Sequence, residues 1–344
     1  MREALTYDDV LLAPQYSDIK SRQEIDIGSS LDDDLLLEVP LLGAPMDTVT
    51  ESEMAFVLAR HGAMGIIHRY NDIDEQAGMV REIHHALMPM GGTPPVIAAA
   101  VGVTGEYVER AIALCENGAM VICIDVAHGH HVLVREALYK LKTELDDKVH
   151  LMAGNVATLE AFNDLSDWGA DSVRCNIGGG SICSTRIQTG HGLPGLQTVL
   201  DCAQSDRDTK IIADGGIRSS GDMVKAFAAG ADFVMVGSLL AGTAESPGTL
   251  STDGDVPVKR YRGMASKEAQ IKWQGHYNSN EGISTHIPYK GSVQPILDDL
   301  IKGIRSGLSY SGARNLTELC AKARFERQTG AGQVEGTAHI LGRP

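Results

Sequence analysis

Eight short apolar runs follow one another between residues 40 and 238, and each ends near a glycine or a polar residue. Because these runs do not alternate with polar residues, they are typical of parallel strands that are buried on both faces. Two of the segments between them, 106–117 and 158–168, have the apolar spacing of amphipathic helices. The predicted strands are 40–46, 62–68, 95–102, 120–127, 150–157, 170–178, 210–217 and 231–238.

Eight strands that alternate with helices favour a closed (β/α)8 barrel, the TIM-barrel fold, over an open doubly wound sheet. We expect residues 1–344 to form one such domain. In this fold the carboxyl ends of the strands share one site, and the loops after strands 7 and 8 often hold a phosphate. Polar residues at the predicted strand ends are Asp47, His68, Asp125, Asn155, Asp214 and Ser238.

Residues 243–290 interrupt this regular pattern, since they are polar, contain glycines and have no clear period. A segment of this length at the catalytic face is typical of a flap, although a disordered surface excursion is the alternative. A predicted helix follows at 293–306, and residues 328–344 form a glycine-rich tail that we expect to pack on a neighbouring subunit.

Composition narrows the range of functions. The chain is 43% hydrophobic but has no apolar run that could span a bilayer and no signal-peptide pattern at its start, so we expect a cytoplasmic protein with reduced thiols. Its formal net charge of −15 argues against a nucleic-acid partner, because phosphate tracking requires clustered Lys and Arg. Any bound nucleotide is therefore expected to be a small one, held by local backbone dipoles.

The strongest chemical signal is a glycine-rich loop that contains a cysteine. Residues 176–186 read Asn-Ile-Gly-Gly-Gly-Ser-Ile-Cys-Ser-Thr-Arg. A glycine triplet alone is more often a simple turn, but at the end of a predicted barrel strand it lets backbone N–H groups approach a phosphate. Cys183 then lies where its sulfur could attack the molecule that carries the phosphate. The loop therefore predicts covalent chemistry on a nucleotide.

Several longer motifs resemble the IMP dehydrogenase/GMP reductase family, and the resemblance runs from end to end. The chain most resembles a short-flap GMP reductase that lacks the regulatory CBS modules and has dehydrogenase-like sequence features, such as the tail at 330–336. The motifs that carry the resemblance are 5–14, 45–51, 153–155, 178–186, 213–216, 237–242 and 261–264.

The resemblance implies a role for each matching residue. The catalytic residues would be Cys183, Thr185 and Glu281. The substrate would be bound by Ser181, Asp214, Gly215, Gly216, Gly237, Ser238, Tyr261, Gly263, Met264, Ala265 and Gly282. The cofactor would contact Ser21, Arg22, Arg69, Asp125, Val126, Ala127 and Asn155. The family also implies a homotetramer.

The flap separates the two reactions that the family implies. Both attack C2 of a purine 5′-monophosphate with the cysteine. The dehydrogenase flap carries an Arg-Tyr pair that activates water, but here the only candidates are His276 and Tyr277. Without a general base, hydrolysis of the adduct loses about a hundredfold in rate. We therefore expect an NADPH-dependent GMP reductase; the alternatives are an IMP dehydrogenase that uses NAD and a non-catalytic purine nucleotide-binding barrel.

Two further sets of residues concern metals. The resemblance implies a potassium ion on the carbonyls of Gly178, Gly180 and Cys183, with Glu335 of the partner subunit completing the site. Two departures bear on this loop: Gly179 replaces the family's usual proline or serine, and Arg-Cys-Asn at 174–176 replaces Lys-Val-Gly. The histidines at 128–131 invite a metal interpretation, but surface and cofactor-edge positions are preferred, because no cysteine or second carboxylate completes a tetrahedral site.

Overall fold

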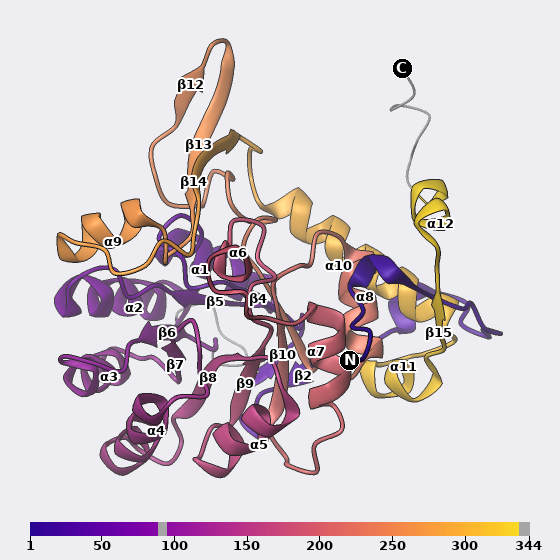
Figure 1. The fold of residues 1–344 in the computed structure, drawn as a ribbon, viewed down its shortest axis with the longest axis horizontal. Helices are drawn as coiled ribbons and strands as arrows, with labels where there is room; N and C mark the ends of the chain where they lie inside the picture. The colour runs from indigo at the N-terminus through magenta and orange to yellow at the C-terminus, as the bar shows by residue number, and fades with distance from the viewer. Residues whose placement is uncertain (89–94, 337–344) are drawn as a thin grey trace.

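The predicted strands pair in chain order around a closed parallel barrel in the computed structural model, which describes residues 1–88 and 95–336 (Figure 1). Each observed strand lies within its predicted range, so the TIM-barrel prediction is confirmed. The barrel strands are β4 (Leu41–Gly43), β5 (Met64–Ile67), β6 (Ala98–Val101), β7 (Val121–Asp125), β8 (His150–Val156), β9 (Ser172–Cys175), β10 (Lys210–Asp214) and β11 (Phe233–Val236). The ring closes where β11 pairs with β4.

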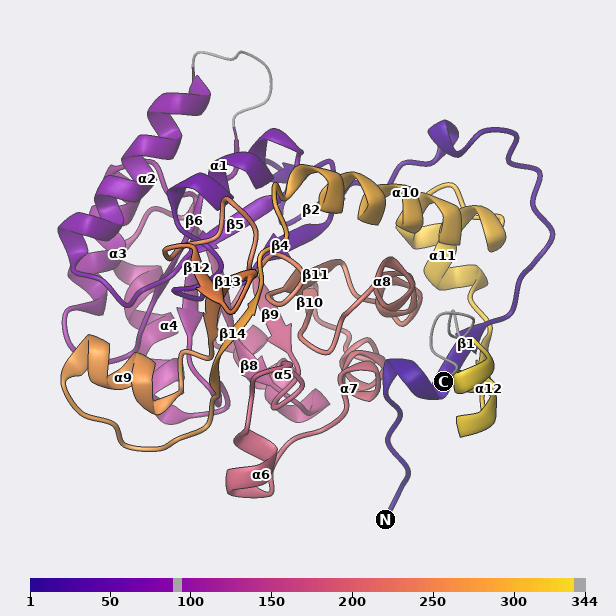
Figure 2. The same cartoon turned by 90° about the horizontal axis from the view of Figure 1, so that it is seen from above.

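Helices surround the strands, as Figure 2 shows from above. The predicted helix at 158–168 is α5 (Leu159–Asp167), which begins where Thr158 accepts a hydrogen bond from the N–H of Ala161 and buries Phe162 and Leu165. The other helices of the ring are α1 (Ser52–Arg60), α2 (Ile73–Leu87), α3 (Tyr107–Glu116), α4 (Val132–Glu144), α7 (Gly195–Cys202) and α8 (Ser220–Ala228), and the short α6 (Thr185–Thr189) follows the cysteine loop.

A small hairpin plugs the amino-terminal end of the barrel. Its strands, β2 (Ser29–Ser30) and β3 (Leu36–Leu37), are antiparallel. Leucines of this segment, Leu31 and Leu35 among them, join the apolar cluster inside the barrel. With that end filled by side chains, a pocket within the barrel opens at the carboxyl ends of the strands.

The flap is more regular than its sequence predicts. Residues 243–290, which show no clear period, contain a three-stranded antiparallel sheet of β12 (Ser251–Asp253), β13 (Val256–Arg262) and β14 (Ser284–Pro288), and a helix, α9 (Lys267–Gln274). The alternative of a disordered surface excursion is therefore wrong, because the segment is folded. Both faces of β12 and most of β14 are exposed, so no alternation of apolar and polar residues marks these strands.

The remaining elements lie beside the barrel. The predicted helix at 293–306 is α10 (Gln294–Tyr310), and α11 (Leu316–Lys322) follows it. Near the ends of the chain, β1 (Val10–Leu12) pairs with β15 (Phe325–Arg327), flanked by the 3-10 helices η1 (Tyr7–Asp9) and η2 (Arg22–Glu24) and by α12 (Gly330–Glu335). The tail beyond 336 lies outside the described residues. Among those described, no helix has the length and apolar character needed to cross a membrane.

Candidate active site

A cavity of about 340 Å³ opens at the carboxyl ends of the barrel strands, beneath the flap. Nearly all of the residues that the sequence assigns to a site line it. They are Arg69, Asp125, Val126, Ala127, Asn155, Gly178, Gly180, Ser181, Cys183, Thr185, Asp214, Gly215, Gly216, Gly237, Ser238, Tyr261, Gly263, Met264, Ala265 and Glu281. Motifs that are far apart in the chain therefore converge on one pocket, as the barrel fold predicts.

Three predicted residues do not line this cavity. Gly282 lies behind the wall, where its backbone bridges Cys183 and Ser266. Its glycine is required there, because a Cβ atom would stand 2.8 Å from the Ser266 nitrogen. Ser21 and Arg22 form the start of η2, which packs on α10. Within one chain these two residues lie outside the pocket, since the amino-terminal segment runs along the outside of the barrel, and their contact with the cofactor stays a prediction.

The three predicted catalytic side chains form a continuous relay. The Sγ atom of Cys183 lies 3.2 Å from Oγ1 of Thr185, and that hydroxyl donates to Oε2 of Glu281 over 2.9 Å. The flap delivers Glu281 to this position through backbone pairing, because the N–H of Ser184 donates to the Glu281 carbonyl (2.9 Å). A thiol, a hydroxyl and a carboxylate in series can move a proton between the cavity and the flap.

A second set of residues forms a cradle suited to phosphate. Gly215 and Gly216 have φ angles of 84° and 76°, which side chains rarely adopt. A Cβ atom on Gly215 would lie 3.2 Å from the Gly180 nitrogen, so the loop after β10 approaches the cysteine loop closely. The hydroxyl oxygens of Ser181 and Tyr261, which also line the cavity, lie 3.4 Å apart. Burial raises the pKa of Tyr261, which keeps its phenol protonated as a donor.

Arg174 is a central residue of the pocket that the sequence marks only as a departure from the family pattern. It is 7% exposed and bridges two carboxylates, with Nη1 2.6 Å from Asp125 and Nη2 2.9 Å from Asp214. Burial alone would lower the pKa of Arg174, but Asp214 and Asp125 raise it well above its usual value. The guanidinium thus joins the residues expected at the substrate ribose to those expected at the cofactor.

This bridge changes how Asp214 can bind a ribose. Its Oδ2 atom accepts from Arg174 and also from Nδ2 of Asn155 (2.8 Å). Among the described residues nothing donates a hydrogen bond to Oδ1, so that atom is available for a sugar hydroxyl. Asn155 thus holds Asp214 in place, and it lies between the part of the pocket expected to bind the ribose and the part expected to bind the cofactor.

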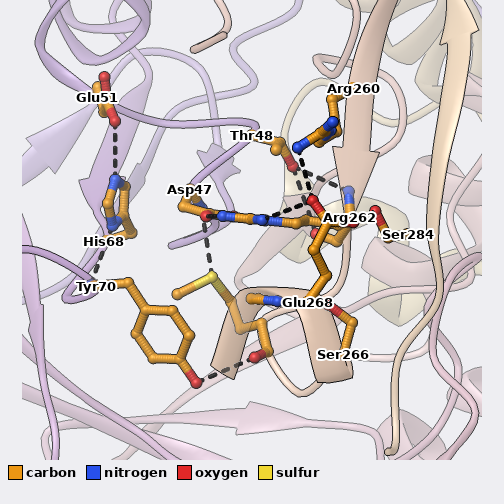
Figure 3. Close-up of polar contacts among 12 residues, drawn as sticks. Asp47, Thr48, Glu51, His68, Tyr70, Arg260, Arg262, Ser266, Glu268 and Ser284 are labelled. Carbon is orange, nitrogen blue, oxygen red and sulfur yellow. Dashed lines mark hydrogen bonds and ion pairs between the residues drawn. The ribbon is translucent and has the colours of Figure 1, made fainter. Parts of the chain in front are cut away.

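The loops after β4 and β5 anchor the flap where it enters the cavity, as Figure 3 shows. Arg262 on β13 forms a buried ion pair with Asp47, with Nε 3.0 Å from Oδ2. The Asp47 N–H lies 3.3 Å from the sulfur of Met264, and the hydroxyl of Tyr70 donates to the Met264 carbonyl over 3.0 Å. Asp47, Arg262 and Met264 lie in the family-like motifs, whereas Tyr70 lies outside them, and the sequence predicts no role for Tyr70 or Arg262.

The histidines at 128–131 have structural partners. Nε2 of His130 lies 2.7 Å from Asp164, and its ring stacks on Trp168. The Nδ1 atom of His131 caps the start of α4. Among the described side chains, no group of three or more His, Cys, Asp or Glu residues could hold a metal ion.

These features define a TIM-barrel protein whose pocket holds a cysteine beside a threonine and a glutamate, between a glycine cradle and a flap. Residues 4–339 match the family model described as the IMP dehydrogenase / GMP reductase domain. The chain therefore belongs to this family, whose members are named as dehydrogenases and reductases and are oxidoreductases.

The similar proteins include both IMP dehydrogenases and GMP reductases. An inosine-5′-monophosphate dehydrogenase from Nitrosopumilus maritimus is 33% identical, with 98% of each sequence covered. A GMP reductase from Leishmania major is 32% identical over 99% of this chain and 98% of its own. These alignments run over 469 and 480 positions, more than the 344 residues here, so both relatives carry internal segments that this chain lacks.

A solved structure is similar throughout. A GMP reductase variant from Trypanosoma brucei in complex with guanosine 5′-monophosphate superposes with a TM-score of 0.93 at 30% identity, covering 98% of both chains. The near-equal identities to dehydrogenases and reductases leave the direction of the reaction to the residues of the site.

Proposed function

We propose that this protein is a GMP reductase that converts GMP to IMP and ammonia with NADPH as the reductant. The observation that carries this proposal is which side chains of the flap, residues 243–290, line the cavity. From residues 243–290, Glu281 is the only carboxylate or basic side chain that lines the cavity. The two other candidates for activating water, His276 and Tyr277, are exposed outside it, and Tyr277 packs against Lys267 instead.

The relay supports ammonia release. The thiol proton of Cys183 passes through the Thr185 hydroxyl to Glu281, the sulfur bonds to C2 of the purine while the bond from C2 to the 2-amino group breaks, and the departing nitrogen takes that proton back from Glu281 through Thr185. When bound, a reduced nicotinamide supplies the hydride that takes the place of the amino group at C2. The C2–S bond then breaks and Cys183 recovers its electron pair. The balance is GMP, NADPH and two protons giving IMP, NADP⁺ and ammonium.

The residues fit the nicotinamide end of such a cofactor. Asp125, Asn155 and Arg69 line the cavity, and Nε of Arg69 lies 3.6 Å from Asp125. Ser21 and Arg22 could contact the 2′-phosphate only from a partner subunit, as the implied homotetramer would allow. The tetramer, the preference for NADPH and a cytoplasmic location remain predictions.

The test is the absorbance of the reduced nicotinamide with purified protein. With GMP and NADPH, we expect absorbance to fall with stoichiometric release of ammonia, and Cys183→Ala to abolish this. If absorbance instead rises with IMP and NAD and does not fall with GMP and NADPH, the protein is an IMP dehydrogenase. If both mixtures are silent while GMP binds, the protein is a nucleotide-binding barrel without this chemistry.

A further inference from the structure

Asn176, which directly follows β9, has an unusual backbone conformation for a residue with a side chain. Its φ angle is 135°, and among the described residues no other non-glycine residue has a positive φ. The residue is also buried, with 3% of its surface exposed. A strained conformation of this kind persists only where surrounding contacts hold it, so the contacts of Asn176 must offset its cost.

The side-chain amide of Asn176 reaches the loop that is expected to hold the nucleotide. Its Nδ2 atom donates to the carbonyl of Asp214 over 2.9 Å and to that of Gly215 over 3.3 Å. Asp214 is the carboxylate expected at the ribose, and Gly215 is the first glycine of the cradle expected at the phosphate. Asn176 lines the cavity, but both hydrogens of its amide are used in these bonds. It would therefore act on a nucleotide through the loop after β10.

The rest of Asn176 is tied to two other segments. Its backbone carbonyl accepts from Nδ2 of Asn155 (3.0 Å), which also donates to the Asp214 carboxylate (2.8 Å). Its Oδ1 atom accepts from Nη2 of Arg186 (3.1 Å), one residue after Thr185. Asn176 therefore joins the ends of β8 and β10 to α6, the helix that follows the nucleophile.

The amide also lies against the glycine triplet that precedes Cys183. A Cβ atom on Gly179 would stand 2.0 Å from Nδ2 of Asn176. The amide could make room for a side chain there only by leaving the carbonyls of Asp214 and Gly215. Asn176 and Gly179, which both depart from the family pattern, are therefore a matched pair in which the amide occupies the space that a side chain at 179 would fill. The carbonyls expected to hold potassium belong to the same loop, and that site stays a prediction because its last ligand would come from a partner subunit.

We propose that Asn176 is a positioning residue that sets the spacing between Cys183 and residues 214–216, the loop expected to hold the ribose and phosphate. The inference deepens the proposed function and rests on it, because it concerns the same nucleotide. Cys183 has to reach C2 of the purine while the ribose and phosphate are held at the other end of the molecule. A misplacement of about 1 Å between reacting atoms costs about a hundredfold in rate. The spacing therefore matters more for bond formation than for binding, since the loop after β10 can hold the nucleotide at either spacing.

Asn176→Gly removes the amide and relieves the backbone, because glycine adopts a φ of 135° without strain. We expect kcat for GMP to fall about tenfold or more, while the dissociation constant for GMP changes little. Steady-state kinetics and calorimetric titration in potassium chloride measure the two quantities. A dissociation constant that rises as much as kcat falls, or an unchanged kcat, overturns the proposal.

Asn117 provides the matched control, because it makes the same pair of contacts outside the pocket. Its Nδ2 atom donates to the Ala113 carbonyl (2.8 Å), and its Oδ1 atom accepts from Nη1 of Arg81 (3.2 Å). Asn117→Gly should leave kcat and GMP binding unchanged. If it lowers kcat as much as Asn176→Gly does, the effect is one of general stability and the proposal fails.

Asn176→Asp separates the two ends of the amide. A carboxylate still accepts from Arg186 but no longer donates to the carbonyls of Asp214 and Gly215. We expect kcat at saturating GMP to fall as far as in Asn176→Gly. If Asn176→Asp keeps the natural kcat, the contact with Arg186 is what matters and the spacing proposal is wrong. This variant also provides the test if the glycine variant does not fold.

Protection of Cys183 by GMP reports the spacing without turnover. In the natural protein, bound GMP should cover the sulfur and slow its alkylation by iodoacetamide, measured by peptide mass mapping because other free cysteines are present. In Asn176→Gly, saturating GMP should protect Cys183 severalfold less. Equal protection in both proteins, or none in the natural protein, contradicts the inference. Protection that is lost in the variant, without any turnover of GMP by the natural protein, would instead overturn the proposed function and leave this inference standing.

Discussion

Thr185 is the residue on which the proposed chemistry depends most directly, because its hydroxyl lies between the nucleophile and the acid. It is 3.2 Å from the sulfur of Cys183 and 2.9 Å from the Glu281 carboxylate. A hydroxyl in this position accepts a proton from one side and donates one to the other without itself carrying a charge. Glu281 has no direct hydrogen bond to the sulfur among the described contacts, so proton transfer requires the threonine.

Thr185→Val removes the hydroxyl and keeps the shape of the side chain. We expect ammonia release from GMP to slow about a hundredfold, the usual size of a general-acid contribution, while the dissociation constant for GMP changes little. Thr143→Val on α4, whose hydroxyl donates to the Tyr139 carbonyl, is the matched control. Rapid-quench measurement of ammonia and calorimetric titration of GMP check the two expectations. Equal weakening of GMP binding and ammonia release would assign Thr185 a role in binding instead.

At the scale of elements, the flap is fixed to the barrel at its inner edge. The Tyr70 ring, just after β5, stacks on Trp273 of α9 with centroids 5.6 Å apart and planes 9° apart. The Arg110 guanidinium from α3 lies 6.0 Å from the centroid of the same indole ring. The Tyr70 hydroxyl also donates a hydrogen bond to the Met264 carbonyl. One side chain therefore positions both α9 and residues 263–265, which are expected to contact the purine.

Tyr70→Phe separates these two functions, since it keeps the stacked ring and removes only the hydrogen bond to Met264. The loss of one hydrogen bond, about 1 kcal/mol, predicts a GMP dissociation constant about fivefold higher. Tyr139→Phe, on the exposed side of α4, should leave it unchanged. Calorimetric titration with GMP measures both variants. An unchanged dissociation constant in Tyr70→Phe would mean that Asp47 and Arg262 are enough to hold residues 263–265 in place.

For the whole molecule, a buried histidine at the amino-terminal end of the barrel contributes to how stability responds to acid. His150, at the start of β8, is buried, with Nε2 2.8 Å from Ser172 and Nδ1 3.4 Å from Asp32 of the plugging hairpin. Burial lowers the pKa of His150, and neighbouring Asp171 and Asp32 offset this only partly. The folded protein therefore prefers the neutral ring.

The direction of the pH effect follows from this preference. Histidine in the unfolded chain binds a proton near pH 6.5, and folded His150 does so only at lower pH, so the unfolded state binds more protons in between. Stability is fully present above about pH 6.5 and falls as the pH drops toward the lowered pKa. We expect His150→Gln to flatten this loss, measured as the change in unfolding midpoint with pH, whereas exposed His286→Gln should not. Parallel pH curves for the His150 variant and the natural protein would contradict this.

The sequence by itself determined the barrel, because the strands lie in eight mainly apolar runs and burial on both faces accounts for such runs. It also predicted Cys183, Thr185 and Glu281 as one group, since their motifs are local or match a family pattern, and the structure brings these side chains together. It missed the flap sheet, because strands exposed on both faces leave no apolar period.

Only the tertiary structure revealed the contacts between residues distant in the chain. Arg174 acquires its role from Asp125 and Asp214, which come from two other strands. Asn176 and Gly179 look like independent departures from the family pattern until the 2.0 Å approach shows that one requires the other. The physical reason is general: apolar periodicity is encoded locally, whereas the pairing of buried polar groups depends on which segments the fold brings together.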